Sequence, residues 1–192
     1  MRLDSILVCF ILFALGCAQT DQIKSETSAV ASDSIQLIPN KGLVLYQDEP
    51  FSGMSEKHYS NDTLAEVICY QSGIRHGVNR KYFNTGLLSY ETQYANGKLQ
   101  GVSKSWWKNG VLRSLSNFQK GVPNGKQTEW YSSGQKFKEL HLANGKEEGM
   151  QTAWRRNGTI YNNYEAKNGR IFGLKRANLC YELKDEEVQY AD

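Results

Sequence analysis

Residues 101–124, GVSKSWWKNGVLRSLSNFQKGVPN, form one unit of the repeat that decides the fold. Glycine recurs along the chain in three series, each with a step of 24 residues. The series are Gly53, Gly77, Gly101, Gly125, Gly149 and Gly173; Gly73, Gly97, Gly121, Gly145 and Gly169; and Gly86, Gly110, Gly134 and Gly158. Fifteen of the 17 glycines lie on this lattice. A constant period of about 20–50 residues is the signature of a repeat protein, and five units are predicted here.

Each unit contains two turn signals that separate two strand-like segments. Asn109-Gly110 represents the first signal and Asn96-Gly97 the second. Asn-Gly is a strong hairpin signal because a type I′ turn needs positive φ at both central residues. Two such turns leave room for two strands of about ten residues in each unit. We predict an all-β fold: an elongated, single-layer antiparallel β-meander built from five 24-residue hairpin repeats.

Two adjacent aromatic columns run through the units. A two-residue turn at Asn109-Gly110 pairs Trp107 with Leu112 and Trp106 with Arg113, and directly opposed residues share a face. One face then carries the leucine-like residues with Tyr59, Phe83, Trp107 and Tyr131. Water contact with this apolar ladder costs about 25 cal/mol per Å². We therefore expect the sheet to curl over that face or to form a homodimer through it.

The second aromatic column lies on the opposite predicted face, among polar and charged residues. We select a candidate binding strip from it and its neighbours: Tyr82, Trp106, Trp130, Trp154, Lys104 and Arg113. The alternative is structural, because ladders of aromatic residues also hold sheets together.

The N-terminal residues indicate export. Residues 1–16 have a short basic start and an apolar run too short to span a bilayer, which is typical of a signal peptide. Ala14-Leu15-Gly16-Cys17 resembles the lipobox of bacterial lipoproteins, a family in which this cysteine is lipidated and becomes the mature N-terminus. It departs from the commonest form of that motif, which has Leu at the position of Ala14 and a small residue at that of Leu15. We predict lipidation at Cys17, a flexible tether over 17–41, the repeat domain over 42–183 and an acidic tail over 184–192.

The residues give no indication of catalysis. Four cysteines occur, and neither a Cys-x-x-Cys pair nor His pairs at metal spacing are present in the sequence. Nucleophile elbows, phosphate loops and dinucleotide fingerprints are also missing. We expect a protein that is not an enzyme and uses no cofactor or metal. Cys69 and Cys180 are separated by many strands of an open sheet, so we predict free thiols, or a pair formed between molecules.

The unit Gly-x-x-x-x-Trp-Trp-x-Asn-Gly-x-Leu resembles the MORN-repeat-variant proteins of bacteria. Residues Gly101 to Leu112 and Asn144-Gly145-Lys146 carry the resemblance best, and it covers about residues 43–175. It implies antiparallel hairpins in one elongated sheet with interaction or scaffolding roles. Some members are described as antitoxins or membrane-associated proteins. The repeat also looks like the aromatic hairpins of cell-wall-binding modules, which hold glycan or choline between aromatic residues.

These observations lead to one functional expectation and one alternative. We expect a membrane-anchored interaction or scaffolding module at the cell envelope, with a protein partner. The alternative is a wall-glycan-binding module that uses the aromatic strip. The net charge of +3 is too small to indicate nucleic acid as a partner. Ala18 after the lipobox cysteine favours the outer membrane, facing the periplasm or the surface, by resemblance to enterobacterial sorting.

Overall fold

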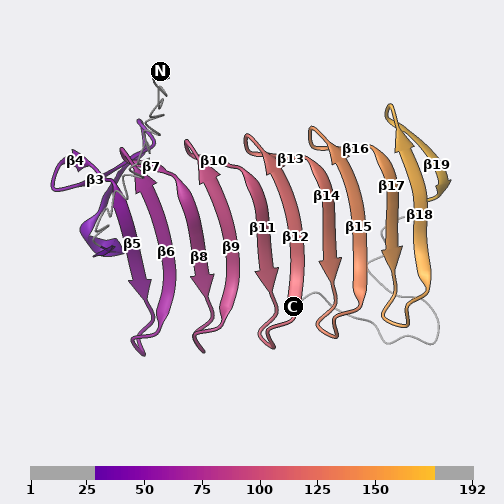
Figure 1. The fold of residues 1–192 in the computed structure, drawn as a ribbon, viewed down its shortest axis with the longest axis horizontal. Coiled ribbons are helices and arrows are strands. Elements are labelled where there is room, and N and C mark those ends of the chain that lie inside the picture. The colour runs from indigo at the N-terminus through magenta and orange to yellow at the C-terminus, as the bar shows by residue number, and fades with distance from the viewer. Residues whose placement is uncertain (1–28, 176–192) are drawn as a thin grey trace, which may run out of the picture.

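The computed structural model describes residues 29–175. Figure 1 shows their strands side by side in one extended row, with hairpin connections alternating between the two ends. The sheet order is β1-β5-β6-β8-β9-β11-β12-β14-β15-β17-β18-β19, and short strands β7, β10, β13 and β16 pair beside β6, β9, β12 and β15. The predicted open, mostly antiparallel sheet of five hairpin repeats is confirmed.

The strands repeat with the period of the sequence. Their bounds are β1 (Ala29–Ala31), β5 (Gly53–His58), β6 (Leu64–Gln71), β7 (Ile74–Arg75), β8 (Gly77–Tyr82), β9 (Leu88–Ala95), β10 (Lys98–Leu99), β11 (Gly101–Trp106), β12 (Leu112–Gln119), β13 (Val122–Pro123), β14 (Gly125–Trp130), β15 (Lys136–Ala143), β16 (Lys146–Glu147), β17 (Gly149–Trp154), β18 (Ile160–Lys167) and β19 (Arg170–Leu174). One long strand, one two-residue strand and one six-residue strand therefore make up each complete step along the sheet.

The second turn of each unit has the predicted conformation. Asn96 and Gly97 have φ of 50° and 77°, and the equivalent residue pairs of the other units also have positive φ at both positions. This is the type I′ turn, whose twist matches that of the flanking strands.

The first turn of each unit differs from the prediction. Gly110 has positive φ but Asn109 does not, and the Gly110 N–H donates to the carbonyl of Trp107 at 2.8 Å. Ser105 pairs with Ser114 and Trp106 pairs with Leu112, so Arg113 is the extra residue of a bulge. A longer loop that ends in a left-handed glycine also contains Asn-Gly, and the dipeptide alone does not distinguish the two geometries.

This bulge corrects the predicted columns. The leucine-like residues pair with His58, Tyr82, Trp106 and Trp154, and Lys136 at the equivalent position pairs with Trp130. They do not pair with the Tyr59, Phe83, Trp107 and Tyr131 column. The predicted pairs Trp107 with Leu112 and Trp106 with Arg113 are therefore wrong by one residue. A shift of one residue reverses the faces that a hairpin assigns to its side chains.

The backbone pairing between neighbouring repeats is interrupted after each two-residue strand. Beside β12, β13 pairs through Phe118–Pro123, whereas β14 pairs through Leu115–Thr128. Between these two ladders the chain turns at Gly125, with φ of 87°. Side chains fill the resulting gap in the hydrogen-bond ladder, as described below.

The N-terminal end of the sheet is covered. β1 pairs in parallel with β5, and a 3₁₀ turn (Ser32–Ser34) leads to a separate sheet of β2 (Gln36–Ile38), β3 (Leu43–Tyr46) and β4 (Glu49–Pro50). The Val44 N–H donates to the Gly73 carbonyl, and the ring of Phe51 lies 5.8 Å from those of Tyr46 and Tyr70. The predicted tether, residues 17–41, thus overlaps β1 and β2 within the described part of the chain.

The interior of the sheet is polar at its centre. Ser55, Asn79, Ser103, Gln127 and Gln151 recur every 24 residues, and each is at most 9% exposed. We call this set the buried polar column. A buried polar group must find hydrogen-bond partners, so this column needs partners from neighbouring strands: Ser103 bonds to the hydroxyl of Thr92, whereas Gln127 and Gln151 bond to the backbone.

Candidate functional site

The Tyr59, Trp107, Tyr131 column joins successive repeats. The hydroxyls of Tyr59 and Tyr131 donate to the carbonyls of Tyr82 and Trp154, and the Trp107 Nε1–H donates to the carbonyl of Trp130 at 3.0 Å. Each bond links a residue to the backbone 23 positions later. These aromatic residues therefore serve the fold.

The candidate strip lies next to this column but has different contacts. Tyr82, Trp106, Trp130 and Trp154 end β8, β11, β14 and β17, and all four are partly exposed. No hydrogen-bond acceptor for the indole N–H of the three tryptophans is found among residues 29–175. Equivalent residues two strands apart are about 10 Å from one another. Tryptophan with an available N–H and exposed ring area is typical of binding hot spots.

The two basic residues of the predicted strip are placed differently. Lys104 lies two residues from Trp106 on β11 and so points to the same face. The guanidinium of Arg113 lies 4.5 Å from the ring centre of Trp107, and thus belongs to the neighbouring column. At the equivalent position of the next unit, Phe137 packs on Tyr131 with ring centres 5.0 Å apart. The Nζ of Lys136 lies 5.6 Å from the ring centre of Trp154.

Lys104 is part of a line of residues that crosses the sheet on one face. Directly opposed pairs connect Glu56, Val67, Arg80, Glu91, Lys104, Leu115, Thr128, Glu139, Thr152 and Asn163. We call this line the central row. Its side chains change in charge and polarity from unit to unit, whereas the lattice glycines recur and the buried polar column stays polar.

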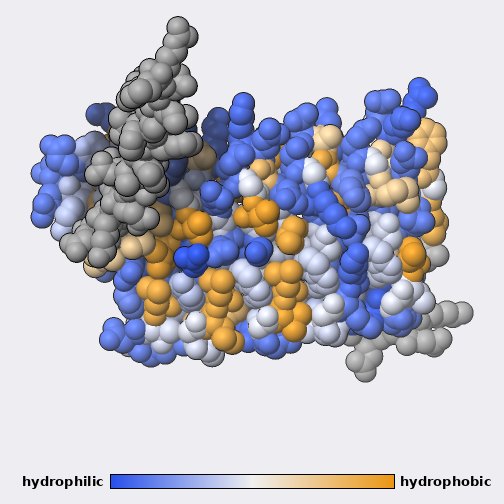
Figure 2. Space-filling view, viewed as in Figure 1, coloured by the Kyte–Doolittle hydropathy of each residue, from blue (hydrophilic) through white to orange (hydrophobic). Residues whose placement is uncertain are grey.

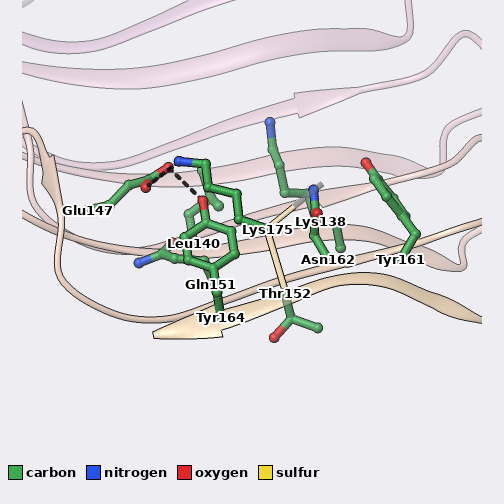
Figure 3. Close-up of a pocket in the computed structure, with 10 residues that line it drawn as sticks. Lys138, Leu140, Glu147, Gln151, Thr152, Tyr161, Asn162, Tyr164 and Lys175 are labelled. Carbon is green, nitrogen blue, oxygen red and sulfur yellow. Dashed lines mark hydrogen bonds and ion pairs between the residues drawn. The ribbon is translucent and has the colours of Figure 1, made fainter. Parts of the chain in front are cut away.

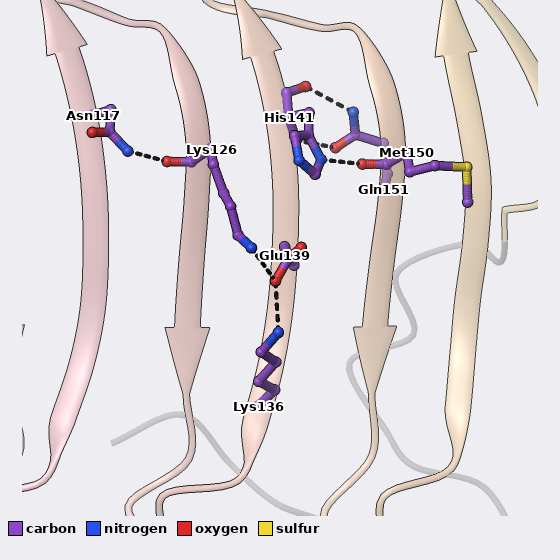
Figure 4. Close-up of polar contacts among 7 residues, drawn as sticks. All are labelled: Asn117, Lys126, Lys136, Glu139, His141, Met150 and Gln151. Atoms are coloured by element: carbon purple, nitrogen blue, oxygen red, sulfur yellow. Dashed lines mark hydrogen bonds and ion pairs between the residues drawn. The ribbon is translucent and has the colours of Figure 1, made fainter.

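Charged residues of the central row are paired. The Arg80 Nε donates to Glu91 at 2.8 Å, and Glu139 accepts from Lys126 at 2.9 Å and from Lys136 at 2.8 Å (Figure 4). Burial by itself would raise the pKa of Glu139, but hydrogen bonds and charge attraction from the two lysines lower it overall. Figure 2 shows hydrophobic residues gathered over the earlier hairpins of one face, and mostly hydrophilic residues over the later ones.

A shallow pocket of about 210 Å³ lies at the C-terminal repeats (Figure 3). The Tyr164 hydroxyl donates to Glu147 Oε1 at 2.9 Å, and Lys175 Nζ lies 3.4 Å from the other oxygen of that carboxylate. Burial and the hydrogen bond to Glu147 raise the pKa of Tyr164. Lys138, which also lines the pocket, pairs with Glu129 outside it at 2.9 Å. The pocket's charged groups are thus engaged in pairs, which indicates a structural role at the end of the array.

Other expected sites can be placed only in part. Cys69 is a half-buried free thiol whose Sγ–H donates to the Val78 carbonyl, and burial raises its pKa. Cys17 and Cys180 lie outside the described residues. Within residues 29–175 no cluster of three or more His, Cys, Asp or Glu could hold a metal ion. The same residues contain no helix that is both long and apolar enough to cross a membrane.

The sequence analysis missed the polar groups that join the repeats. Gln127 and Gln151 each bond through both amide atoms to one residue of the preceding strand, Asn117 and His141. At the second turn of each unit, one side chain accepts a hydrogen bond from the backbone N–H 20 residues later. These side chains belong to Ser52, His76, Gln100, Asn124 and Glu148. Alignment of the units would have revealed both columns, because each contains hydrogen-bonding side chains at a constant step of 24.

Comparison with known proteins adds no identification, because neither a family model nor a curated protein matches this chain. The observed sheet of repeated hairpins is consistent with MORN-like repeats.

Proposed function

We propose that this protein is a non-enzymatic interaction platform of the MORN-repeat-variant type, anchored at the bacterial cell envelope by a lipid on Cys17. The open sheet offers a long surface, and its binding strip consists of Tyr82, Trp106, Trp130 and Trp154 with Lys104 beside them.

One observation carries this proposal. Trp106, Trp130 and Trp154 recur at equivalent positions of three successive hairpins, partly exposed, with indole N–H groups that have no acceptor in the described part of the chain. The adjacent column at Trp107 is bonded to the next repeat. The repeat therefore uses one of its two aromatic columns for cohesion and leaves the other available to a partner.

The central row favours a protein as the partner. A partner that reads this face meets a different side chain in each unit, such as Glu56, Arg80 and Lys104 at equivalent positions. Such a surface suits a protein with its own irregular pattern of charges, because electrostatic complementarity gives specificity.

A wall glycan is the second candidate, and the recurrence of tryptophan itself favours it. Aromatic side chains at a step of about 10 Å could each stack on a sugar ring of a repeating polymer. A glycan would need the three tryptophans and would be insensitive to charge changes in the central row.

The test compares two neighbouring tryptophans. The triple variant Trp106→Ala, Trp130→Ala, Trp154→Ala should keep the fold and lose its partner in crosslinking pull-downs from whole cells. Trp107→Ala is the matched structural control, and should destabilise the sheet instead, because it removes a stacked ring and an inter-repeat hydrogen bond. If the triple variant unfolds, at about 3–5 kcal/mol for each core aromatic, the column is structural and the proposal fails.

Two further measurements separate the partner classes. Tryptophan fluorescence that responds to wall fragments, with binding unchanged in Lys104→Glu, indicates the glycan. A crosslinked protein that is lost in both the triple variant and Lys104→Glu indicates the protein partner.

The anchor has its own test. Cys17→Ser should release the protein from the membrane fraction, and palmitate should label the wild type only. Retention of the variant in the membrane, or wild type that takes up no label, would show that the anchor is not a lipid on Cys17. Separation of inner and outer membranes then tests the proposed outer-membrane location.

A further inference from the structure

The first turns of the units lie along one edge of the sheet, where β8, β11, β14 and β17 turn into the strands that follow them (Figure 1). The turn segments of the four later units are residues 82–88, 106–113, 130–137 and 154–161. We call this the first-turn edge. Its sequence has no Asp or Glu and five cations: Lys108, Arg113, Lys136, Arg155 and Arg156. No carboxylate within these segments balances that charge.

Two arginines of this edge are held in place by aromatic rings. The guanidinium of Arg113 lies 4.5 Å from the ring centre of Trp107, and that of Arg156 lies 5.2 Å from the ring centre of Tyr131. Trp107 and Tyr131 occupy equivalent positions of successive units, and each is fixed by its own hydrogen bond to the next repeat. Both arginines are exposed. Stacking on a ring orients a guanidinium and leaves its N–H donors for a ligand.

The cations of this edge differ in how far they are neutralised. Lys136 pairs with Glu139 at 2.8 Å. Neither Lys108 nor the two stacked arginines forms an ion pair with a carboxylate among residues 29–175. Lys108, Arg113 and Arg156 therefore present uncompensated positive charge on neighbouring loops.

The backbone of the first-turn edge is held by bonds within and between its loops. The side-chain oxygen of Asn109 accepts from the Val111 N–H at 3.2 Å, and its amide nitrogen donates to the Ser132 carbonyl at 2.8 Å. Asn157 makes the same local bond in the last unit. A Cβ at Gly110 would have no atom within 4 Å, so the tip of this loop is open. A ligand thus meets loops that are already ordered, which lowers the entropic cost of binding.

We propose that the first-turn edge binds a linear polymer with phosphate groups, through Arg113 and Arg156 with Lys108 beside them. The planar guanidinium fork matches the geometry of a phosphate group. Equivalent positions of successive units are about 10 Å apart, so regularly spaced phosphates can meet one loop after another. A single row of cations suits a linear polymer better than the broad surface of a bilayer. This site is separate from the tryptophan strip, and the inference does not depend on the proposed function.

The test measures the affinity of the full-length protein for labelled inorganic polyphosphate by fluorescence anisotropy over a range of salt concentrations. Arg113→Gln combined with Arg156→Gln should weaken binding at least about tenfold, because each charge-assisted hydrogen bond contributes about that factor. The salt dependence should fall as well, since fewer counterions are released.

The matched control is Lys98→Gln combined with Lys146→Gln. It removes the same charge from the opposite edge, where Glu147-Glu148 accompany the lysines, and should weaken binding by less than about threefold. Thermal melts establish that both double variants are folded. If the arginine variant unfolds, Lys108→Glu takes its place, because this exposed loop residue forms no ion pair among the described residues and its charge reversal should also weaken binding.

Four outcomes would overturn the proposal. Wild type that does not bind polyphosphate has no such site, and equal losses in the two double variants would show general charge attraction only. Equal affinity for phosphatidylglycerol vesicles, with the same dependence on Arg113 and Arg156, would assign the edge to a lipid surface. Binding that appears only after Asp185→Asn, Glu186→Gln and Glu187→Gln would show that the acidic tail of the chain itself occupies the edge.

Discussion

Replacement of Gln151 by leucine tests how the repeats are held together. Gln151 is 1% exposed, and its side-chain amide replaces a missing piece of backbone ladder between β15 and β17. Its Oε1 accepts from the His141 N–H at 3.1 Å, and its Nε2 donates to the carbonyls of His141 at 2.8 Å and Gly149 at 3.2 Å. Leucine has a similar size but neither donates nor accepts, so Gln151→Leu leaves the His141 N–H without this partner. The His141 carbonyl still accepts from the Glu148 N–H at 2.9 Å.

An unsatisfied buried polar group costs about 1–3 kcal/mol. One such group, the His141 N–H, is left, so the expected loss is about 1–3 kcal/mol. For a domain of this size that lowers the Tm by roughly 3–10 °C. The array is quasi-one-dimensional, so the loss should fall first on the repeats next to the substitution.

Urea denaturation measures the total loss, and hydrogen exchange locates it in β15–β18. The control is Gln93→Leu, a glutamine-to-leucine change on an exposed position of β9, which should remain within about 0.5 kcal/mol of wild type. If Gln151→Leu is as stable as this control, or more stable than wild type, the amide does not bridge the repeats and the account of the buried polar column is wrong.

Three further predictions concern other parts of the sheet. Glu139 has a lowered folded-state pKa, so its ion pairs with Lys126 and Lys136 stabilise the fold above its ordinary value of 4.5, and this contribution is lost as the pH falls through the lowered value. Acid titration of stability should therefore show a smaller loss in Glu139→Gln, and equal slopes would contradict the pairing. Gly97→Ala should destabilise by about 1–3 kcal/mol in thermal melts, since Gly97 has φ of 77° and a Cβ would lie 3.1 Å from a methyl group of β7. Burial raises the pKa of Cys69, so at pH 8 its alkylation by iodoacetamide should be slower in the folded protein than in urea, and equal rates would show that the thiol is not protected.

The turn sequences show how far local patterns can be trusted. Asn96-Gly97 has the conformation that its sequence predicts, whereas Asn109-Gly110 forms a longer loop with a bulge at Arg113. Both turns need glycine in a left-handed conformation, so the glycine lattice predicts their positions. It does not say whether the preceding residue is also left-handed. That difference moves the pairing at the loop end of the hairpin by one residue, to Trp106 with Leu112, whereas Ser105 with Ser114 keeps the pairing of a two-residue turn.

The buried polar column shows the opposite case. Gln127 and Gln151 read as surface residues in a strand, and their burial follows from the gap that each Gly125-type turn opens between repeats. Only the three-dimensional path of the backbone reveals which peptide groups lack partners. A side chain at that point must then supply a donor and an acceptor.

The sequence by itself determined the period, the number of hairpins, the all-β class and the open form of the sheet, because each rests on turn residues that act over four or five positions. Tertiary structure alone decided which aromatic column joins the repeats and which remains available, how the N-terminal edge is covered, and which polar residues are buried. The physical reason is that these properties depend on register and on contacts between units 20 or more residues apart. A one-residue bulge, which local sequence does not resolve, decides which aromatic column pairs with the leucine-like residues.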